Sequence, residues 1–271
     1  MGFPSGCHPR YDAGVETTAG SDHLLARMEE DLRRIGIGPG SLIMVHSSLK
    51  SLGPYAVDPE LVVCAMMGAL SPGGTLLMPA LSLDQEPDRL HSTADTPSDI
   101  GAIPEHFRLR AGTLRSVHPT HSVCGAGPRA AELLERHAED STPCGPGSPF
   151  RRILDLDARI VMLGCGLLPN TTMHAIEELV EPPYLFGEPC EYHIAPAAGC
   201  VYTKRYRRHA FHGWTQRYDR IADLGSTTLI ATGQVLDAEV HVIDTRLLKT
   251  LATAALRRDP WFFVEPDRGA P

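Results

Sequence analysis

Lysine is nearly missing from this 271-residue chain, which has only Lys50, Lys204 and Lys249. Arginine therefore carries most of the positive charge, and 33 acidic residues against 25 lysines and arginines give a formal net charge of −8. The longest basic stretch is the Arg-Tyr-Arg-Arg of residues 205–208. Because phosphate backbones are bound by an excess of positive charge, these features exclude nucleic acid as a main partner. The negative field instead favours a cationic small molecule.

Long apolar runs and paired cysteines are also missing. The sequence has no run of about 18 apolar residues and no basic N-terminal segment followed by an apolar one, so neither a membrane span nor export is predicted. The seven cysteines are scattered and contain no CxxC pair, which disfavours a secreted disulfide framework. We therefore expect a cytoplasmic protein without a membrane partner.

Several common cofactor and catalytic motifs are not found. No GxGxxG follows a strand, the glycines of residues 141–149 do not lead into Gly-Lys-Ser/Thr, and there is no GxSxG. These absences disfavour dinucleotide, P-loop nucleotide and serine-hydrolase chemistry. Thirteen histidines make close pairs of metal-ligand residues common by chance, and the pairs that occur form no recognised zinc set. The pairs are His118 with His121, Cys190 with His193, and His209 with His212.

The sequence contains alternating short apolar strands and amphipathic helices. Residues 1–20 are rich in Gly, Pro, Ser and Thr and are interpreted as a flexible lead-in, and residues 21–271 as a single domain. Helices are predicted over 21–35, 59–70, 102–109, 128–138, 170–179 and 245–258, and strands over 41–45, 75–79, 115–123, 160–163 and 227–230. Residues 182–220 are expected to be irregular. The alternation predicts an α/β domain.

His174 and Glu177 are the first candidates for catalysis. They lie three residues apart on the predicted helix 170–179, so that both side chains project from one face. A carboxylate beside an imidazole raises its basicity and fixes its tautomer, as a general base acting on an amine requires. A solvated surface pair is the alternative. Their position directly after the Asn170-Thr171-Thr172 turn, behind a predicted strand, favours a site.

Two other groups of polar residues have the chemistry of binding sites. The Ser47-Ser48 pair after a strand, the Arg115-Ser116 pair and the turn 141–149 supply hydroxyls, a guanidinium and backbone amides that could hold a pyrophosphate. The loop 82–100 is acidic and could hold a cationic substrate, although a solvated loop is the simpler interpretation.

Five blocks of residues occur together in a fixed order. They are His46-Ser47-Ser48-Leu49 with Gly53, residues 101–108, Arg115-Ser116 with His118 to Ser122, Pro143-x-Gly145-x-x-Ser148-Pro149, and Thr172-Met173-His174-x-x-Glu177. In content and order this series resembles the aminoglycoside 3-N-acetyltransferase family, over about residues 21–264. The resemblance implies a mixed sheet core with flanking helices, unlike the GNAT acetyltransferases. It further implies acetyl-CoA as the donor, no metal, and transfer to the 3-amino group of a 2-deoxystreptamine aminoglycoside, a reaction of antibiotic resistance.

The resemblance also implies roles for single residues. It places the general base on His174, Glu177 beside it, and a second catalytic histidine on His121. Coenzyme A contacts are implied for His46, Ser47, Ser48, Leu49, Arg115, Ser116, Thr120, Ser122, Gly145 and Ser148. On the acceptor side we expect the carboxylates of Asp84, Glu86, Asp95 and Glu178. Direct transfer is implied, with oxyanion donors near Thr171-Thr172 or Ser47.

Other hypotheses remain open at the level of the sequence. The basic stretch 201–209 would repel a polycationic antibiotic, which leaves room for a biosynthetic acetyltransferase acting on a different amine. A catalytically silent coenzyme A-binding module would keep the groove without turnover. A hydrolase using cysteine or metal is the third alternative. The chain could act as a monomer or as a homodimer.

Overall fold

The computed structural model describes residues 19–267. The predicted flexible lead-in therefore lies outside the described residues, except for Ala19 and Gly20. These two residues already belong to helix α1 (Ala19–Arg34), so the helix begins before the expected cap at Ser21. No helix within residues 19–267 is both long enough and apolar enough to cross a lipid bilayer.

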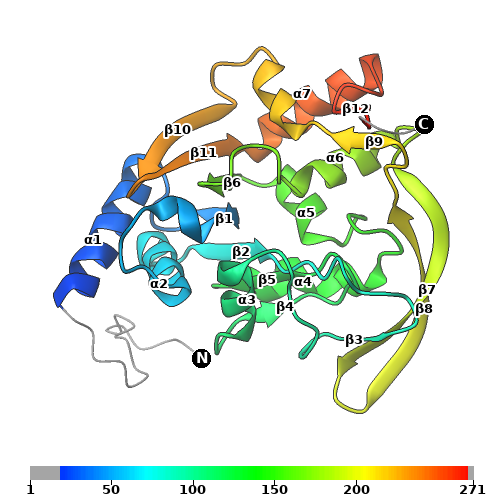
Figure 1. Ribbon diagram of the computed structural model, residues 1–271, viewed down its shortest axis with the longest axis horizontal. Coiled ribbons are helices and arrows are strands. Elements are labelled where there is room, and N and C mark those ends of the chain that lie inside the picture. The colour runs from blue at the N-terminus through cyan, green and yellow to red at the C-terminus, as the bar shows by residue number, and fades with distance from the viewer. Residues whose placement is uncertain (1–18, 268–271) are drawn as a thin grey trace.

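A seven-stranded mixed sheet forms the centre of the molecule, in the order β10-β11-β6-β1-β2-β5-β4 (Figure 1). Its strands are β1 (Leu42–Ser47), β2 (Thr75–Pro79), β4 (Leu114–Arg115), β5 (Val123–Ala126), β6 (Ala158–Leu163), β10 (Ile230–Val235) and β11 (Ala238–Asp244). The central strands β6, β1 and β2 are parallel, and the strands outside them pair antiparallel. The predicted mixed α/β class is confirmed.

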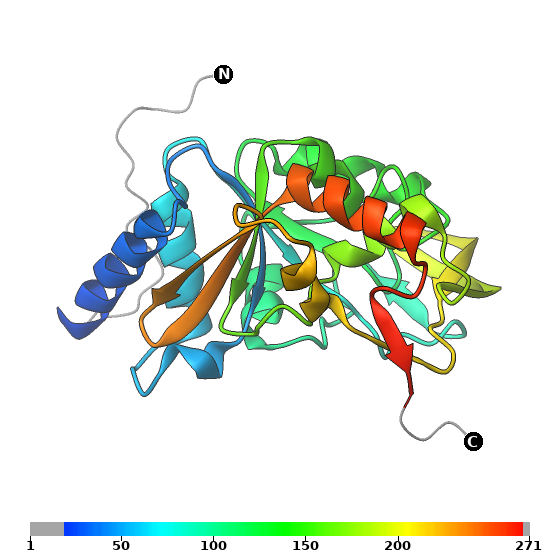
Figure 2. The same ribbon diagram turned by 90° about the horizontal axis from the view of Figure 1, so that it is seen from above.

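Helices cover both faces of this sheet (Figure 2). Ile43 and Val45 of β1 pack toward α1, α2 (Pro59–Leu70) and α3 (Ala102–Leu109). Leu42 and Met44 point to the other face, which is covered by α4 (Ala130–Leu134), α5 (Pro149–Arg152), α6 (Thr172–Val180) and α7 (Thr245–Arg258). A strand buried on both faces needs apolar residues at every position, which explains the continuous apolar runs in the sequence.

Short 3-10 segments connect several of these elements. They are η1 (Leu49–Leu52), η2 (Glu135–Glu139), η3 (Ile153–Asp155) and η4 (Tyr218–Asp223). The predicted helix over 128–138 is in fact α4 followed directly by η2, because the last turn of that segment tightens.

The expectation that residues 182–220 are irregular is wrong. This segment forms the long antiparallel strands β7 (Phe186–Ala197) and β8 (Cys200–His209), which extend beyond the central sheet, and β3 (Leu90–Ser92) joins β7 in parallel (Figure 1). A separate pair joins β9 (Trp214–Gln216) to β12 (Val264–Pro266). Most side chains of β8 are exposed, so the hairpin has little of the apolar patterning by which strands are recognised.

The carboxyl ends of the parallel strands meet at one edge of the sheet. His46 pairs in register with Met162 and Ser47 with Leu163, so β1 and β6 end side by side. The chain then passes from β6 through a loop into α6. In open α/β sheets ligands bind outside this edge, and the fold therefore directs attention to it.

Candidate active site

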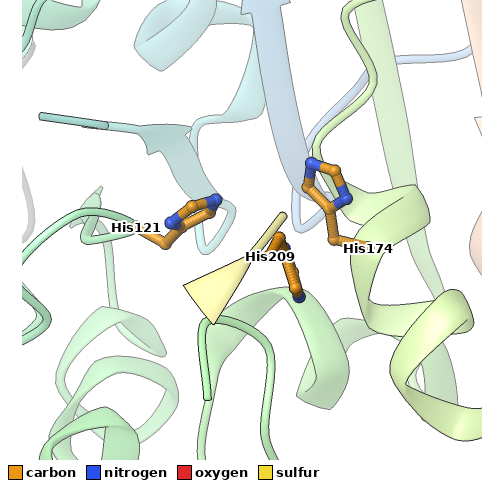
Figure 3. A group of neighbouring side chains, drawn as sticks. All are labelled: His121, His174 and His209. Atoms are coloured by element: carbon orange, nitrogen blue, oxygen red, sulfur yellow. The ribbon is translucent and has the colours of Figure 1, made fainter. Parts of the chain in front are cut away.

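Four histidines from distant parts of the sequence line one cavity at this edge of the sheet. His46 lies near the end of β1, and His174 lies in the first turn of α6. His121 follows β4, and His209 is the last residue of β8. The rings of His121, His174 and His209 converge on a common space (Figure 3). The cavity has a volume of about 390 Å³.

A buried carboxylate holds the imidazole of His174. Glu177 is 0% exposed, and its Oε2 lies 3.1 Å from His174 Nδ1. The hydroxyl of Tyr218 donates to the same Oε2 at 2.7 Å and lies 2.9 Å from Nδ1. The hydroxyl of Tyr184 donates to Oε1 at 2.8 Å. The predicted pairing of His174 with Glu177 is thus present as a buried network and not as a surface ion pair.

This network determines which nitrogen of His174 carries the proton. The Tyr218 hydroxyl already gives its proton to Glu177, so its oxygen and the carboxylate both accept from Nδ1–H. With the proton on Nδ1, the lone pair of the neutral ring is on Nε2. Burial and the neighbouring Glu177 carboxylate raise the pKa of Tyr218 well above its ordinary value, so the phenol stays protonated.

Sequence reasoning did not find Tyr184 and Tyr218. They lie 7 and 41 residues from Glu177 along the chain, in segments without a recognisable motif. His209 was noted only for its spacing to His212, and in the structure its neighbours are His121 and His174, with ring centroids 5.5 Å and 4.7 Å away. The sequence signal for His209 was its spacing to His212, with two residues between them, and this spacing did not indicate its structural neighbours His121 and His174.

The other histidines of the cavity are kept neutral by their surroundings. Burial lowers the pKa of His46 to about 3. Burial, followed by the repulsion of neighbouring imidazoles, also lowers the pKa values of His121 and His209 well below the ordinary range. Neutral rings have a lone pair to offer and do not repel a positively charged ligand.

The first cavity combines apolar walls with two free polar donors. Leu81, Ile100 and Leu168 contribute to its walls. Ser47 Oγ and Asn170 Nδ2 are buried and have no hydrogen-bond partner among the described residues, although both side chains line the cavity. Buried donors without partners are rare and indicate a place where a ligand oxygen belongs.

A second cavity, of about 430 Å³, adjoins the first and is more polar. His121 and His209 line both cavities, so these rings stand where the two meet. Glu86 and Glu188 line the second cavity together with Arg208. Glu188 lies on β7, in the segment that was expected to be irregular, and sequence reasoning did not single it out.

Some of the residues predicted to contact coenzyme A line a cavity, and others do not. His46 and Ser47 line the first cavity and Thr120 the second. Ser48 and Leu49 lie in the turn after β1, where Leu49 begins η1.

The expectation for Arg115 does not fit its placement. Its guanidinium donates to Ser122 Oγ and Ser82 Oγ and to the carbonyl oxygens of Thr93, Thr96 and Ala80, at 2.6–3.1 Å, which uses every N–H donor of the group. Burial lowers the pKa of Arg115 to about 10. Arg115 therefore joins the loop 93–96 to the end of β2 and has no donor left for a phosphate.

Four further residues of that prediction lie outside both cavities. Ser116 Oγ bonds to His137 Nδ1 and to the amide of Val123, and Ser122 Oγ donates to the carbonyl of Ala80. Ser148 is 0% exposed, and its Oγ has no hydrogen-bond partner among the described residues. A side chain at Gly145 would meet Asp140. Because none of the four lines either cavity, they are better explained as supports of the loops around the site.

Of the four carboxylates predicted on the acceptor side, only Glu86 lines a cavity. Glu86 lines the second cavity, whereas Asp84 and Asp95 are exposed and line neither one. Asp95 bonds to Ser92 within its own loop. Glu178 is buried beneath the histidines, where it accepts from Thr142, the amide of Cys144 and His209 Nε2 at 2.6–2.8 Å. Its position supports His209 and not the acceptor directly.

The structure disfavours the cysteine hydrolase hypothesis. Cys165 lines the first cavity, and burial raises the pKa of its thiol to about 11. A cysteine nucleophile needs the thiolate, which is favoured by a lowered pKa. The site thus combines a buried carboxylate–histidine pair with two adjoining cavities at the sheet edge, an arrangement typical of an enzyme active site.

Comparison with known proteins specifies this class. The family model for aminoglycoside 3-N-acetyltransferases matches residues 44–257. The chain is 32% identical over 248 residues to the aminoglycoside N(3)-acetyltransferase IV of Salmonella sp, covering 90% of this chain and 91% of that protein. It is 31% identical to enzyme VIII of Streptomyces fradiae over 61% of this chain and 64% of that protein. The chain belongs to the aminoglycoside 3-N-acetyltransferase family.

Solved structures agree with this assignment. A histidine-to-alanine mutant of aminoglycoside acetyltransferase AAC(3)-IVa in complex with a gentamicin has a TM-score of 0.76 and 29% identity, with 94% of each chain covered. AAC-IIIb in its binary complex with CoASH has a TM-score of 0.77 at 20% identity, over 91% of this chain and 98% of that one, and shares the fold. The predicted family and the predicted acyltransferase class are confirmed.

Proposed function

We propose that this protein transfers the acetyl group of acetyl-CoA directly to the 3-amino group of a 2-deoxystreptamine aminoglycoside, with His174 as the general base. The observation that carries the proposal is the buried pairing of His174 Nδ1 with Glu177 and Tyr218 beside the cavities. This pairing leaves Nε2 as the nitrogen that accepts a proton. Family membership supports the acyl transfer, and relatives such as the aminoglycoside N(3)-acetyltransferase IV of Salmonella sp support the choice of acceptor.

The first cavity is the better place for the acyl donor. Its apolar walls suit a pantetheine arm, and Ser47 lies where β1 ends, beside the predicted coenzyme A residues Ser48 and Leu49. The free donors Ser47 Oγ and Asn170 Nδ2 would bond to the thioester oxygen as it becomes negatively charged. The sequence alone predicts oxyanion donors nearby, at Ser47 or Thr171-Thr172.

The second cavity is the better place for the cationic acceptor. Glu86 and Glu188 supply negative charge there, and the neutral rings of His121 and His209 mark its border with the first cavity. The acceptor amine would approach the thioester carbon past these rings. The proton released as nitrogen attacks passes to His174 Nε2, and the coenzyme A thiolate leaves. No cysteine of the chain forms a covalent intermediate in this scheme.

The test is a thiol-release assay with acetyl-CoA and gentamicin or apramycin as acceptors. We expect turnover by the parent and a fall in kcat of about 10²–10⁴-fold in His174→Ala, the range that a general base contributes. His23→Ala, which removes an exposed histidine of α1, is the matched control and keeps the parent rate. Undiminished turnover by His174→Ala would remove the assigned base.

The same assay separates the remaining hypotheses. Coenzyme A binding in calorimetry without transfer to any amine would identify a silent binding module. Turnover with other amines and not with aminoglycosides would identify a biosynthetic acetyltransferase. Mass spectrometry of the product, with the acetyl group located on the 3-amino nitrogen, tests the regiochemistry.

A further inference from the structure

Three of the cavity histidines form a cluster with the features of a metal site. One nitrogen from each of His121, His174 and His209 lies within 4.8 Å of the other two (Figure 3). The rings come from three separate segments of the chain and all line the first cavity, where His121 and His209 border the second. His121 and His174 are buried, and the side chain of His209 is 5% exposed. We propose that His121, His174 and His209 bind a divalent zinc ion, and that the bound ion inhibits acetyl transfer by occupying the lone pair of the general base.

The hydrogen bonds of the three rings support this assignment. Each ring uses one nitrogen for a bond to a neighbour: His174 Nδ1 to Glu177 at 3.1 Å, His209 Nε2 to Glu178 at 2.8 Å, and His121 Nδ1 to Thr120 at 2.8 Å. Metal-binding histidines have such partners, commonly a carboxylate, on the nitrogen that does not face the metal, because the bond fixes the ring and raises its basicity. Two of these partners are carboxylates.

The nitrogen left over on His209 is an independent observation. Its Nδ1 is buried and has no hydrogen-bond partner among residues 19–267, and the side chain is only 5% exposed. Because Nε2–H donates to Glu178, Nδ1 bears a lone pair. A buried acceptor without a donor is destabilising, and binding of a cation would supply the missing partner.

Charge and geometry favour zinc in particular. The site brings together three imidazoles and the two carboxylates of Glu177 and Glu178, against the single guanidinium of Arg151, which lies 4.0 Å from Glu178. The set is net negative and attracts a divalent cation. In tetrahedral zinc sites the Zn–N distance is about 2.0–2.1 Å, so the ligand nitrogens must move together by about 1.5 Å or less, which small side-chain rotations can supply. The fourth position faces the cavities and is open to water or to a thiol.

The expected inhibition of acetyl transfer follows because one zinc ligand is His174. This step rests on the proposed function, in which His174 is the general base. His174 Nε2 is the nitrogen that takes the proton of the amine, and a nitrogen bound to zinc has no lone pair to offer. The inferred site therefore makes the metal a competitor of the reaction and not its cofactor.

Binding is tested without turnover, by titrating the metal-free protein with ZnCl2 in a calorimeter and with CoCl2 in a spectrophotometer. We expect one saturable site and the visible ligand-field bands typical of four-coordinate Co²⁺. His121→Ala and His209→Ala should each weaken zinc binding by more than the ~10–100-fold that loss of a ligand's hydrogen-bond partner costs. His23→Ala is the matched control and should bind zinc as the parent does.

Folding of each variant is checked by its circular dichroism and thermal transition, and His209→Gln serves where His209→Ala does not fold. Equal zinc affinity in the parent and in both histidine variants would overturn the site. Zinc binding to a parent that still transfers acetyl at its full rate would overturn the inhibition. A parent without transferase activity would refute the proposed function and leave the calorimetric result standing, so the two failures are distinguishable.

Discussion

At the scale of the residue, the main feature of the candidate active site is the hydrogen-bond network around Glu177. Two tyrosine hydroxyls and one imidazole surround a carboxylate that has no contact with solvent. A buried charge of this kind is tolerated only when its acceptors are satisfied. The network therefore fixes His174 through Glu177, and Tyr218 acts as a positioning residue for both.

Tyr184 and Tyr218 form a matched pair for testing this network. Tyr184→Phe and Tyr218→Phe each remove one bond to Glu177, and each should lower the free energy of unfolding by about 1–3 kcal/mol in urea titration. Only Tyr218 also lies within bonding distance of His174, so kcat should fall further in Tyr218→Phe than in Tyr184→Phe. Equal kcat values in the two variants would show that Tyr218 does not position the imidazole.

The second cavity, which we propose as the acceptor site, gives a second prediction for single residues. Glu86→Gln and Glu188→Gln each remove an exposed negative charge from its walls, so the KM for the aminoglycoside should rise about 1.5–5-fold in each variant, while the KM for acetyl-CoA stays unchanged. Asp95→Asn is the matched control, because Asp95 is exposed and lies outside both cavities. A parallel rise of both KM values would contradict the separation of donor and acceptor.

At the scale of the element, the turn after η1 depends on one glycine. Gly53 has φ 99°, a region that side chains rarely adopt, and a Cβ there would lie too close to the carboxylate of Asp237. Gly53→Ala should cost about 1–3 kcal/mol of stability, measured as a fall in Tm. Gly38→Ala, where a Cβ would meet no atom within 4 Å, should change stability by only about 0.5 kcal/mol. A similar loss in both variants would mean that the turn is not strained.

The helices and strands also show which parts of the fold can be predicted from sequence patterns. Helix α2 spans the predicted residues 59–70, and Asp244 caps α7 as expected by accepting from the amide of Leu247. These segments carry their signals locally, in a capping side chain and an apolar face. The β7–β8 hairpin carries a weaker signal, because only Tyr192, Ile194 and Tyr206 of its strands are fully buried, and backbone pairing with each other and with β3 holds the rest.

The same limit applies to the site. His174 with Glu177 is a contact within one helical turn, and its spacing was sufficient to find it. His209 and Tyr218 reach the site only through the path of the chain after α6, which no local pattern encodes. Arg115 shows the opposite limit, because its side chain suits phosphate binding by type, whereas in the structure its guanidinium donates to internal carbonyls and hydroxyls.

At the scale of the whole molecule, buried histidines make stability depend on pH. Burial lowers the pKa of His91 to about 3 and of His137 to about 4, against an ordinary value near 6.5. Arg115 adds to the effect at His91, and Lys204 lowers the pKa of His137 further. The folded state thus binds fewer protons than the unfolded chain between pH 6.5 and these values.

The sign of the effect follows from this difference. The contribution of the neutral rings is complete above pH 6.5 and is lost as the pH falls toward 4 and 3. At pH 5 the contribution of each histidine to the free energy of unfolding should be lower by about 2 kcal/mol than at neutral pH. The measurement is the slope of the unfolding free energy against pH, from urea titrations between pH 7.5 and 4.5. His91→Gln should flatten this slope, and His23→Ala, at an exposed position, should not. An unchanged slope in His91→Gln would contradict the assignment.

The two cavities differ in what builds their walls, and this difference bears on how the family diversifies. His174 and Glu177 stand on α6 against the central sheet, whereas Glu86 and Glu188 lie on a loop and on a peripheral hairpin. With the acceptor in the second cavity, as proposed, substitutions in these outer segments would change which antibiotics fit and leave the proposed reactive centre in place. The range of antibiotics accepted and the acetyl-transfer activity would therefore evolve through substitutions in separate parts of one chain.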